Sequence, residues 1–105
     1  MKITELREIL ENIEEIDWAK ALYFAVPSDY SLRARCSVLD PDESEEPEGE
    51  TYKFAQDNKL SYCISIADVE SILENARQQI GKVSLEKYHK AFLFYLENDA
   101  YYEFV

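Results

Sequence analysis

The spacing of apolar residues changes twice along this chain, and this change most constrains its fold. Apolar residues recur every three or four positions near the N-terminus, every second position over 33–38 and 60–66, and every three or four positions again after residue 68. The first spacing is typical of amphipathic helices and the second of half-buried strands. The sequence therefore predicts an α+β fold in the order helix, strand, strand, strand, helix, helix. We expect a small antiparallel sheet of about three strands with three helices packed largely on one face.

Turn and capping residues indicate where the first three elements begin and end. Thr4 precedes a helical stripe over about residues 4–15 and is expected to cap its first turn. The apolar run "ALYFAVP" stops at Pro27, and the turn-forming residues "PSDYS" join it to "RARCSVL". These two runs are therefore expected to form a hairpin.

The C-terminal half carries similar signals. The run "LSYCISI" over 60–66 is the expected third strand. Asp68 is placed to cap the next helix, which closes near Gly81, and Ser84 is placed to cap the last one. We find no repeat or linker, so residues 1–105 are expected to form a single domain.

An acidic segment, "LDPDESEEPEGET", lies between the second and third expected strands. Pro41, Pro47 and Gly49 disfavour regular structure, so we expect an acidic loop at about 40–50. The whole connection is about twenty residues, longer than packing requires, which makes it a functional candidate. The segment holds seven acids and no base: Asp40, Asp42, Glu43, Glu45, Glu46, Glu48 and Glu50.

This segment does not follow the calcium-binding EF-hand pattern. With Asp40 at loop position one, the position that needs Gly is Glu45 and the position that needs a bidentate Glu is Thr51. We therefore expect no specific metal site, although loose association with divalent cations stays open as an alternative. Phosphate-binding glycine motifs are absent from the sequence, and no cofactor is expected.

The net charge of −11 limits the class of partner, and the seven acids account for most of it. Such a charge disfavours nucleic acids and anionic membranes and favours a basic protein. The tail combines acids with aromatic residues that could anchor a contact. The candidate partner-binding residues are therefore the seven acids with Glu97, Asp99, Tyr101, Tyr102 and Glu103, and the terminal carboxylate adds to the same field.

Two other readings of the acidic segment stay open. It could be an ordinary solvated loop, which is the usual role of a charge run. Arg33 and Arg35, on one side of the second expected strand, could also neutralise part of it within the molecule. Such a pairing would be structural and would contribute little to stability.

The sequence does not favour an enzyme. The single histidine, His89, lies at the edge of the last helical stripe, and nothing marks a nucleophile or an orienting acid for it. Cys36 and Cys63 sit in alternating apolar segments and are expected to be buried thiols, with a bridge between neighbouring strands as the alternative in an exported protein. The sequence has neither a signal-peptide pattern nor a membrane-spanning run, so a cytoplasmic location is expected.

Four segments resemble, in order and spacing, small acidic bacterial immunity proteins found beside polymorphic toxins, including those of contact-dependent growth inhibition systems. The segments are "LREILENIEEIDW", "CSVLDPDE", "LSYCISIADVESILENARQQ" and "SLEKYHKAFLFYLENDAYYEF". The resemblance spans nearly the whole chain and concerns fold patterns rather than a binding motif. It implies a cytoplasmic monomer that neutralises one cognate toxin, expected to be a nuclease domain, in a one-to-one complex. The alternatives are an acidic adaptor or structural protein and a weak divalent-cation-binding module.

Overall fold

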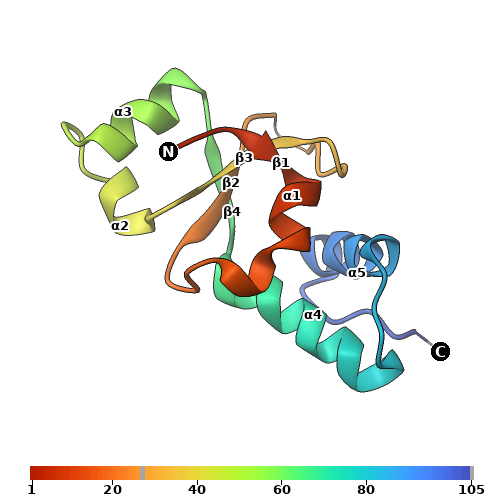
Figure 1. The fold of residues 1–105 in the computed structure, drawn as a ribbon. Coiled ribbons are helices and arrows are strands. Elements are labelled where there is room, and N and C mark those ends of the chain that lie inside the picture. Colours follow the sequence, from red (N-terminus) through yellow and green to blue (C-terminus); the bar gives the residue numbers. More distant parts are fainter. Residues whose placement is uncertain (27, 105) are drawn as a thin grey trace.

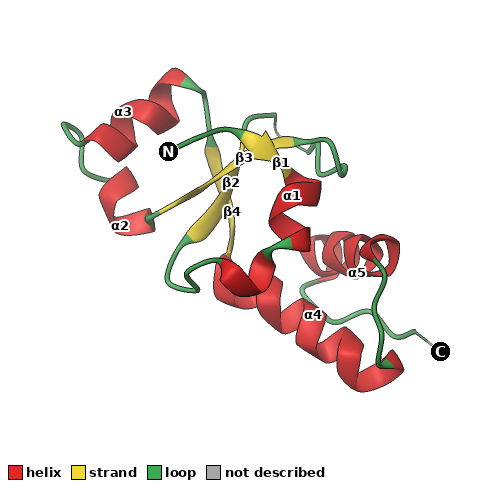
Figure 2. Cartoon of the chain, viewed as in Figure 1, coloured by secondary structure: helices red, strands yellow, loops and turns green. Residues whose placement is uncertain are grey.

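A computed structural model of the chain describes residues 1–26 and 28–104 and has the expected α+β fold (Figures 1 and 2). The sheet is antiparallel, with strand order β1-β3-β2-β4. Pro27, the expected end of the first strand, and the carboxylate of Val105 lie outside the described residues. The elements are β1 (Thr4–Glu5), α1 (Leu6–Glu11), a 3-10 turn η1 (Ile13–Glu15), β2 (Ala21–Phe24), β3 (Arg35–Leu39), α2 (Pro41–Ser44), α3 (Glu50–Asp57), β4 (Ser61–Ser65), α4 (Ile66–Ile80) and α5 (Leu85–Asn98).

The N-terminal helix is shorter than expected because its first residues form a strand. Thr4 pairs with Cys36 and Glu5 with Arg35, which adds β1 to the edge of β3. Thr4 is therefore not the helix cap, and its hydroxyl donates to the Glu8 carboxylate instead. The amides that begin α1 are satisfied by the loop before β3: Leu6 donates to the carbonyl of Ala34. This backbone hydrogen bond replaces the side-chain cap that a helix N-terminus usually has.

The expected hairpin is confirmed, and its first strand lies at the centre of the sheet. β2 pairs with β3 on one side and with β4 on the other, and all four of its residues are buried. Leu22 and Phe24 join the main core, which α1, α4 and α5 cover. Ala21 and Tyr23 join a second small core on the opposite face, where they meet Ala55 of α3.

The expectation that the helices pack largely on one face is therefore wrong for α3. Figure 1 shows α2 and α3 on the opposite side of the sheet from α4 and α5. The physical reason lies in "ALYF", which is apolar without alternation. A strand of this type is buried on both faces and needs cover on each.

The last two helices begin and end close to the expected positions. α4 starts directly after β4, with Ser65 rather than Asp68 as its cap, because the Ser65 hydroxyl accepts the Asp68 amide at 3.1 Å. α4 ends at Ile80, and the following residue, Gly81, has a positive φ of 77°. Ser84 caps α5 as expected, accepting the amide of Lys87 at 3.2 Å. Over the described residues, no helix combines the length and the apolar character needed to cross a membrane.

Candidate functional site

The acidic segment comprises a short helix, α2, a turn over 45–49 and the start of α3. The Asp40 side chain caps α2 by accepting the amides of Asp42 at 2.9 Å and Glu43 at 3.4 Å. Pro41 occupies the first helical turn, where its missing N–H costs nothing and its fixed φ favours the helix. Gly49 then precedes α3. The expectation of an irregular segment was therefore wrong for α2 and correct for the turn over 45–49, which carries Glu45, Glu46 and Glu48. We call residues 40–57 the acidic helix pair.

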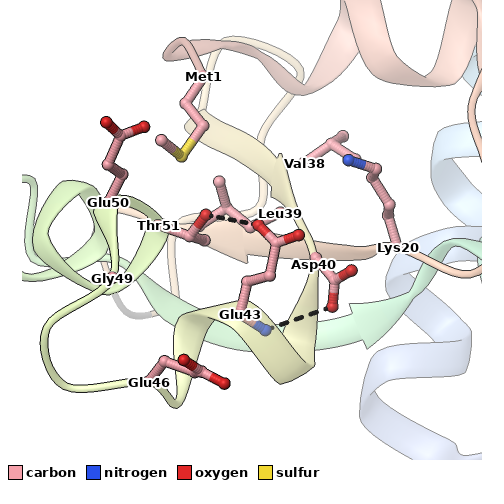
Figure 3. Close-up of a pocket in the computed structure, with 10 residues that line it drawn as sticks. All are labelled: Met1, Lys20, Val38, Leu39, Asp40, Glu43, Glu46, Gly49, Glu50 and Thr51. Carbon is pink, nitrogen blue, oxygen red and sulfur yellow. Dashed lines mark hydrogen bonds between the residues drawn. The ribbon is translucent and has the colours of Figure 1, made fainter.

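Three contacts fix the acidic helix pair to itself and to the sheet. The Tyr23 hydroxyl of β2 lies 2.8 Å from the Ser44 hydroxyl, and Ser44 donates to the carbonyl of Pro41 at 2.9 Å. The hydroxyl of Thr51, which is buried, donates to the Glu43 carboxylate at 3.0 Å and so joins α3 to α2 (Figure 3). These bonds fix α2 and the start of α3, which flank the turn that carries Glu45, Glu46 and Glu48.

The acids themselves face solvent. Six of the seven are exposed, and only the capping residue Asp40 is half-buried. Within the described parts of the chain, the ion pairs join Arg7 to Glu11 and Arg77 to Glu14 and Glu74, so none involves the acidic helix pair. Among the described residues, neither Arg33 nor Arg35 forms an ion pair with these acids. Arg35 begins β3, and Asp40 follows the other end of that strand, so the two lie about 17 Å apart.

A pocket of about 370 Å³ lies beside the acidic helix pair (Figure 3). Apolar side chains of Val38, Leu39 and Met1 line it together with Lys20, and the acids around it are Asp40, Glu43, Glu46 and Glu50. These carboxylates do not converge. In the described residues, no group of three or more His, Cys, Asp or Glu side chains is placed to hold a metal ion.

The candidate residues near the C-terminus lie far from the acidic helix pair. Glu97 is in the last turn of α5, and Asp99 follows the helix in a left-handed conformation with φ 52°. The molecule measures 47 × 23 × 22 Å, and Figure 1 places α2 and α3 at one end and the C-terminal tail at the other. The twelve candidate residues therefore form two separate surfaces rather than one. Their spacing in the sequence could not reveal this separation.

Much of the tail is attached to the helices. The Gln79 side chain of α4 donates to the carbonyl of Tyr102 at 2.8 Å and accepts the amide of Phe104 at 3.0 Å. The Tyr102 ring packs edge-on against Phe94 at 5.4 Å, and the Lys90 ammonium lies 5.0 Å from its centroid. Tyr102 is therefore largely a packing residue. Tyr101 is 43% exposed and Glu103 is also exposed, so these two stay accessible.

Two exposed aromatic residues escaped the sequence analysis. Tyr62 of β4 is 56% exposed and packs edge-on against Tyr23, with the ring centroids 5.5 Å apart. Burial raises the pKa of the Tyr23 phenol, and the nearby Tyr62, Glu45 and Asp40 raise it further. Tyr62 and Ser44 of the acidic helix pair thus both contact Tyr23. The exposure of Tyr62 was not expected because the alternation of the expected strand over 60–66 placed Tyr62 on its buried side.

The second is Trp18, which is 68% exposed. It sits in a tight turn closed by the bond from the Lys20 amide to the Asp17 carbonyl at 3.1 Å. The Asp17 side chain also accepts the amide of Ala19 at 2.9 Å. A fixed turn therefore presents the only tryptophan of the chain to solvent.

His89 has a structural contact. Its Nε2 lies 2.7 Å from the carbonyl oxygen of Tyr30, and because a carbonyl only accepts, Nε2 is the donor. This bond ties α5 to the connection between β2 and β3.

Fold and surface together define a small α+β protein that carries an ordered acidic helix pair at one end. The chain belongs to the family of the domain of unknown function DUF7716, whose family model matches residues 3–104. No curated protein and no solved structure matches the chain.

Proposed function

We propose that this protein binds a basic protein through the acidic helix pair and neutralises it, as an immunity protein covers the basic site of a toxin domain. The observation that carries the proposal is that six carboxylates of one ordered unit are exposed and form no ion pair in the described residues. Unpaired charges of one sign attract an oppositely charged partner and speed its association.

The order of the acidic helix pair supports binding over simple solvation. Ordering a flexible segment on binding costs free energy, and a segment that is already fixed avoids that cost. The Asp40 cap and the bonds of Ser44 and Thr51 supply this order. Tyr62 lies beside the same unit, and exposed tyrosines are frequent anchors of protein interfaces.

The finer proposal is that the partner is a toxin nuclease domain in a one-to-one complex. Nuclease clefts are basic because they hold phosphates, so an acidic surface of fixed shape can occupy such a cleft. The net charge of −11 disfavours nucleic acids and anionic membranes as direct ligands of this protein. Packing around Tyr62 would then provide selectivity, because charge alone attracts any basic protein.

The experiment is a pull-down with tagged protein from a lysate of its own cells, at low salt and at about 0.5 M salt, where exposed charges are strongly screened. We expect one basic partner in stoichiometric amount, retained at low salt and reduced at high salt. The absence of a partner, or retention that does not change with salt, would contradict the proposal.

Two matched double variants locate the surface. Glu46→Lys with Glu48→Lys changes the acidic helix pair, and Glu97→Lys with Glu103→Lys makes the same change in net charge at the other end. All four side chains are exposed. We expect only the first variant to lose the partner. If the partner is an adaptor target that ignores these acids, both variants retain it and the proposed mechanism is wrong.

A further inference from the structure

The two edges of the sheet differ in how they are protected. β1, at one edge, has only two residues, includes Glu5 and turns at once into α1. β4, at the other edge, has five residues, Ser61–Ser65, with no charged residue and no proline. Sheet edges in soluble proteins are usually shortened, charged or covered, because unpaired backbone groups can pair with another chain. β4 is longer than β1 and uncharged, and it contains a bulge, which is another feature that protects an edge.

Among the described residues, no strand pairs with the outer edge of β4. The strand packs chiefly against β2 and against α4, which continues from its end. In the described residues, backbone hydrogen bonds from β4 outside the ladder with β2 are not found. The bulge lies where the register shifts: Leu22 faces Ile64 and Tyr23 faces Tyr62, so Cys63 is the extra residue. A bulge twists an edge locally and does not fill its hydrogen bonds.

The charges around β4 identify the kind of chain that fits. Exposed Asp57 and Asp68 stand before and after the strand, and Lys59 is the single base between them. Tyr62 contacts Tyr23 of the neighbouring strand β2, and the Tyr23 hydroxyl lies 2.8 Å from the Ser44 hydroxyl of the acidic helix pair. A second copy of this chain would bring a charge of −11 to the same place and be repelled. A basic extended segment meets complementary charge.

We propose that β4 accepts an extended, basic segment of the protein partner as a fifth strand of the sheet. The inference rests on the proposed function for the sign of the partner's charge. Main-chain hydrogen bonds to an open edge supply affinity, and alternate side chains of the added strand contact the neighbouring surface. Lys or Arg side chains of the added strand that lie on the same face of the sheet as Tyr62 would contact the acidic helix pair.

The test uses the full chain and a soluble peptide of about ten residues, long enough to cover a five-residue strand, that alternates Lys with Thr and Val. A control peptide has the same sequence with alternate backbone amides methylated, which keeps its charge and removes strand pairing. NMR titration gives the dissociation constants, and hydrogen exchange reports on the β4 amides. We expect the first peptide to slow exchange at β4 and to bind about tenfold more tightly than the control.

A matched pair of protein variants locates the site. Tyr62→Lys puts a positive charge on the edge, and Trp18→Lys makes the same change at another exposed aromatic residue outside the sheet. Because both side chains are largely exposed, both variants should fold. We expect the first to weaken peptide binding about tenfold by charge repulsion and the second to leave it within about twofold.

The other possible outcomes contradict strand addition, the attraction of basic chains or the identity of the occupant. Equal binding of both peptides, with shift changes confined to the acidic helix pair, overturns strand addition and leaves the proposed function intact. If neither peptide binds at low salt, the attraction of basic chains fails and so does the proposed function. If exchange of the β4 amides becomes slower as the protein concentration increases without any peptide, a second copy of the chain occupies the edge and this inference is overturned.

Discussion

Cys36 and Cys63 lie on strands that are not neighbours, because β2 separates β3 from β4. Two strand spacings amount to about 9.6 Å, whereas the Cα atoms of a disulfide lie within about 7 Å. The bridge left open by the sequence is therefore excluded by the sheet order. Burial raises the pKa of the Cys36 thiol to about 12 and that of the Cys63 thiol to about 11.

These thiols should react slowly in the native protein. A pKa about two units above the ordinary value lowers the thiolate fraction at pH 8 about 100-fold for Cys63, and the effect is larger for Cys36. Iodoacetamide labelling followed by mass spectrometry, with and without denaturant, measures this. Rapid native labelling of Cys36 would contradict its burial, and an intramolecular disulfide after mild oxidation would contradict the strand order.

A second residue-level prediction concerns the ion pair between Arg77 and Glu14, whose nearest atoms are 2.7 Å apart. The hydrogen bond and charge of Arg77 lower the pKa of the Glu14 carboxyl. A lowered folded-state pKa adds stability above the unfolded-state value, and this is lost as pH falls through the folded-state value.

Glu14→Gln should therefore lower the free energy of unfolding near pH 7 and have no effect near pH 2. Both groups are exposed, so the difference will be small. Urea unfolding at the two pH values measures it, with Glu15→Gln as a control because Glu15 is an exposed neighbour outside the ion pairs of the described chain. An equal loss at both pH values would show that packing, not charge, is responsible.

At the scale of elements, one side-chain hydrogen bond among the described residues, between Tyr23 and Ser44, joins α2 to the sheet. Tyr23→Phe should cost about 1 kcal/mol in the free energy of unfolding, since it removes a partly buried hydrogen bond and keeps the ring. Amides of α2 should exchange faster, while those of α4 and α5 change little.

Tyr62→Phe is the matched control, because the exposed Tyr62 hydroxyl has no hydrogen bond among the described residues. It should leave the free energy of unfolding unchanged within about 0.5 kcal/mol. If Tyr23→Phe has equally little effect, the acidic helix pair is held by apolar packing alone.

The long elements could be predicted from the sequence and the short ones could not. α4 and α5 have a sustained apolar stripe, a glycine stop and the Ser84 cap, which act locally. β1 has two residues and forms only because β3 offers an edge. α2 has four residues and depends on the Asp40 cap and on Tyr23, which is distant in the sequence. Pro41 was interpreted as a breaker, although proline also favours a first helical turn.

At the scale of the whole molecule, the sequence identified which charges are exposed but not where they lie relative to one another. Charge runs face solvent because burying unpaired carboxylates is costly, so the exposure of Glu46 and Glu103 could be expected. Their separation depends on the sheet order and on the two faces of β2, which no local pattern contains. Tyr62 was missed because the bulge at Cys63 alters the alternation of β4.

The central claim is that the acidic helix pair, and not acidity in general, binds the partner. The most direct measurement is the dissociation constant of the purified complex over a salt series, for the wild type and the two double variants of the acidic helix pair and the C-terminal end. We predict that partner binding by the wild type and by the variant with Glu97→Lys and Glu103→Lys weakens in parallel as the salt concentration rises. The variant with Glu46→Lys and Glu48→Lys should bind about tenfold or more weakly at low salt and respond less to salt. Equal weakening of both variants would contradict the account.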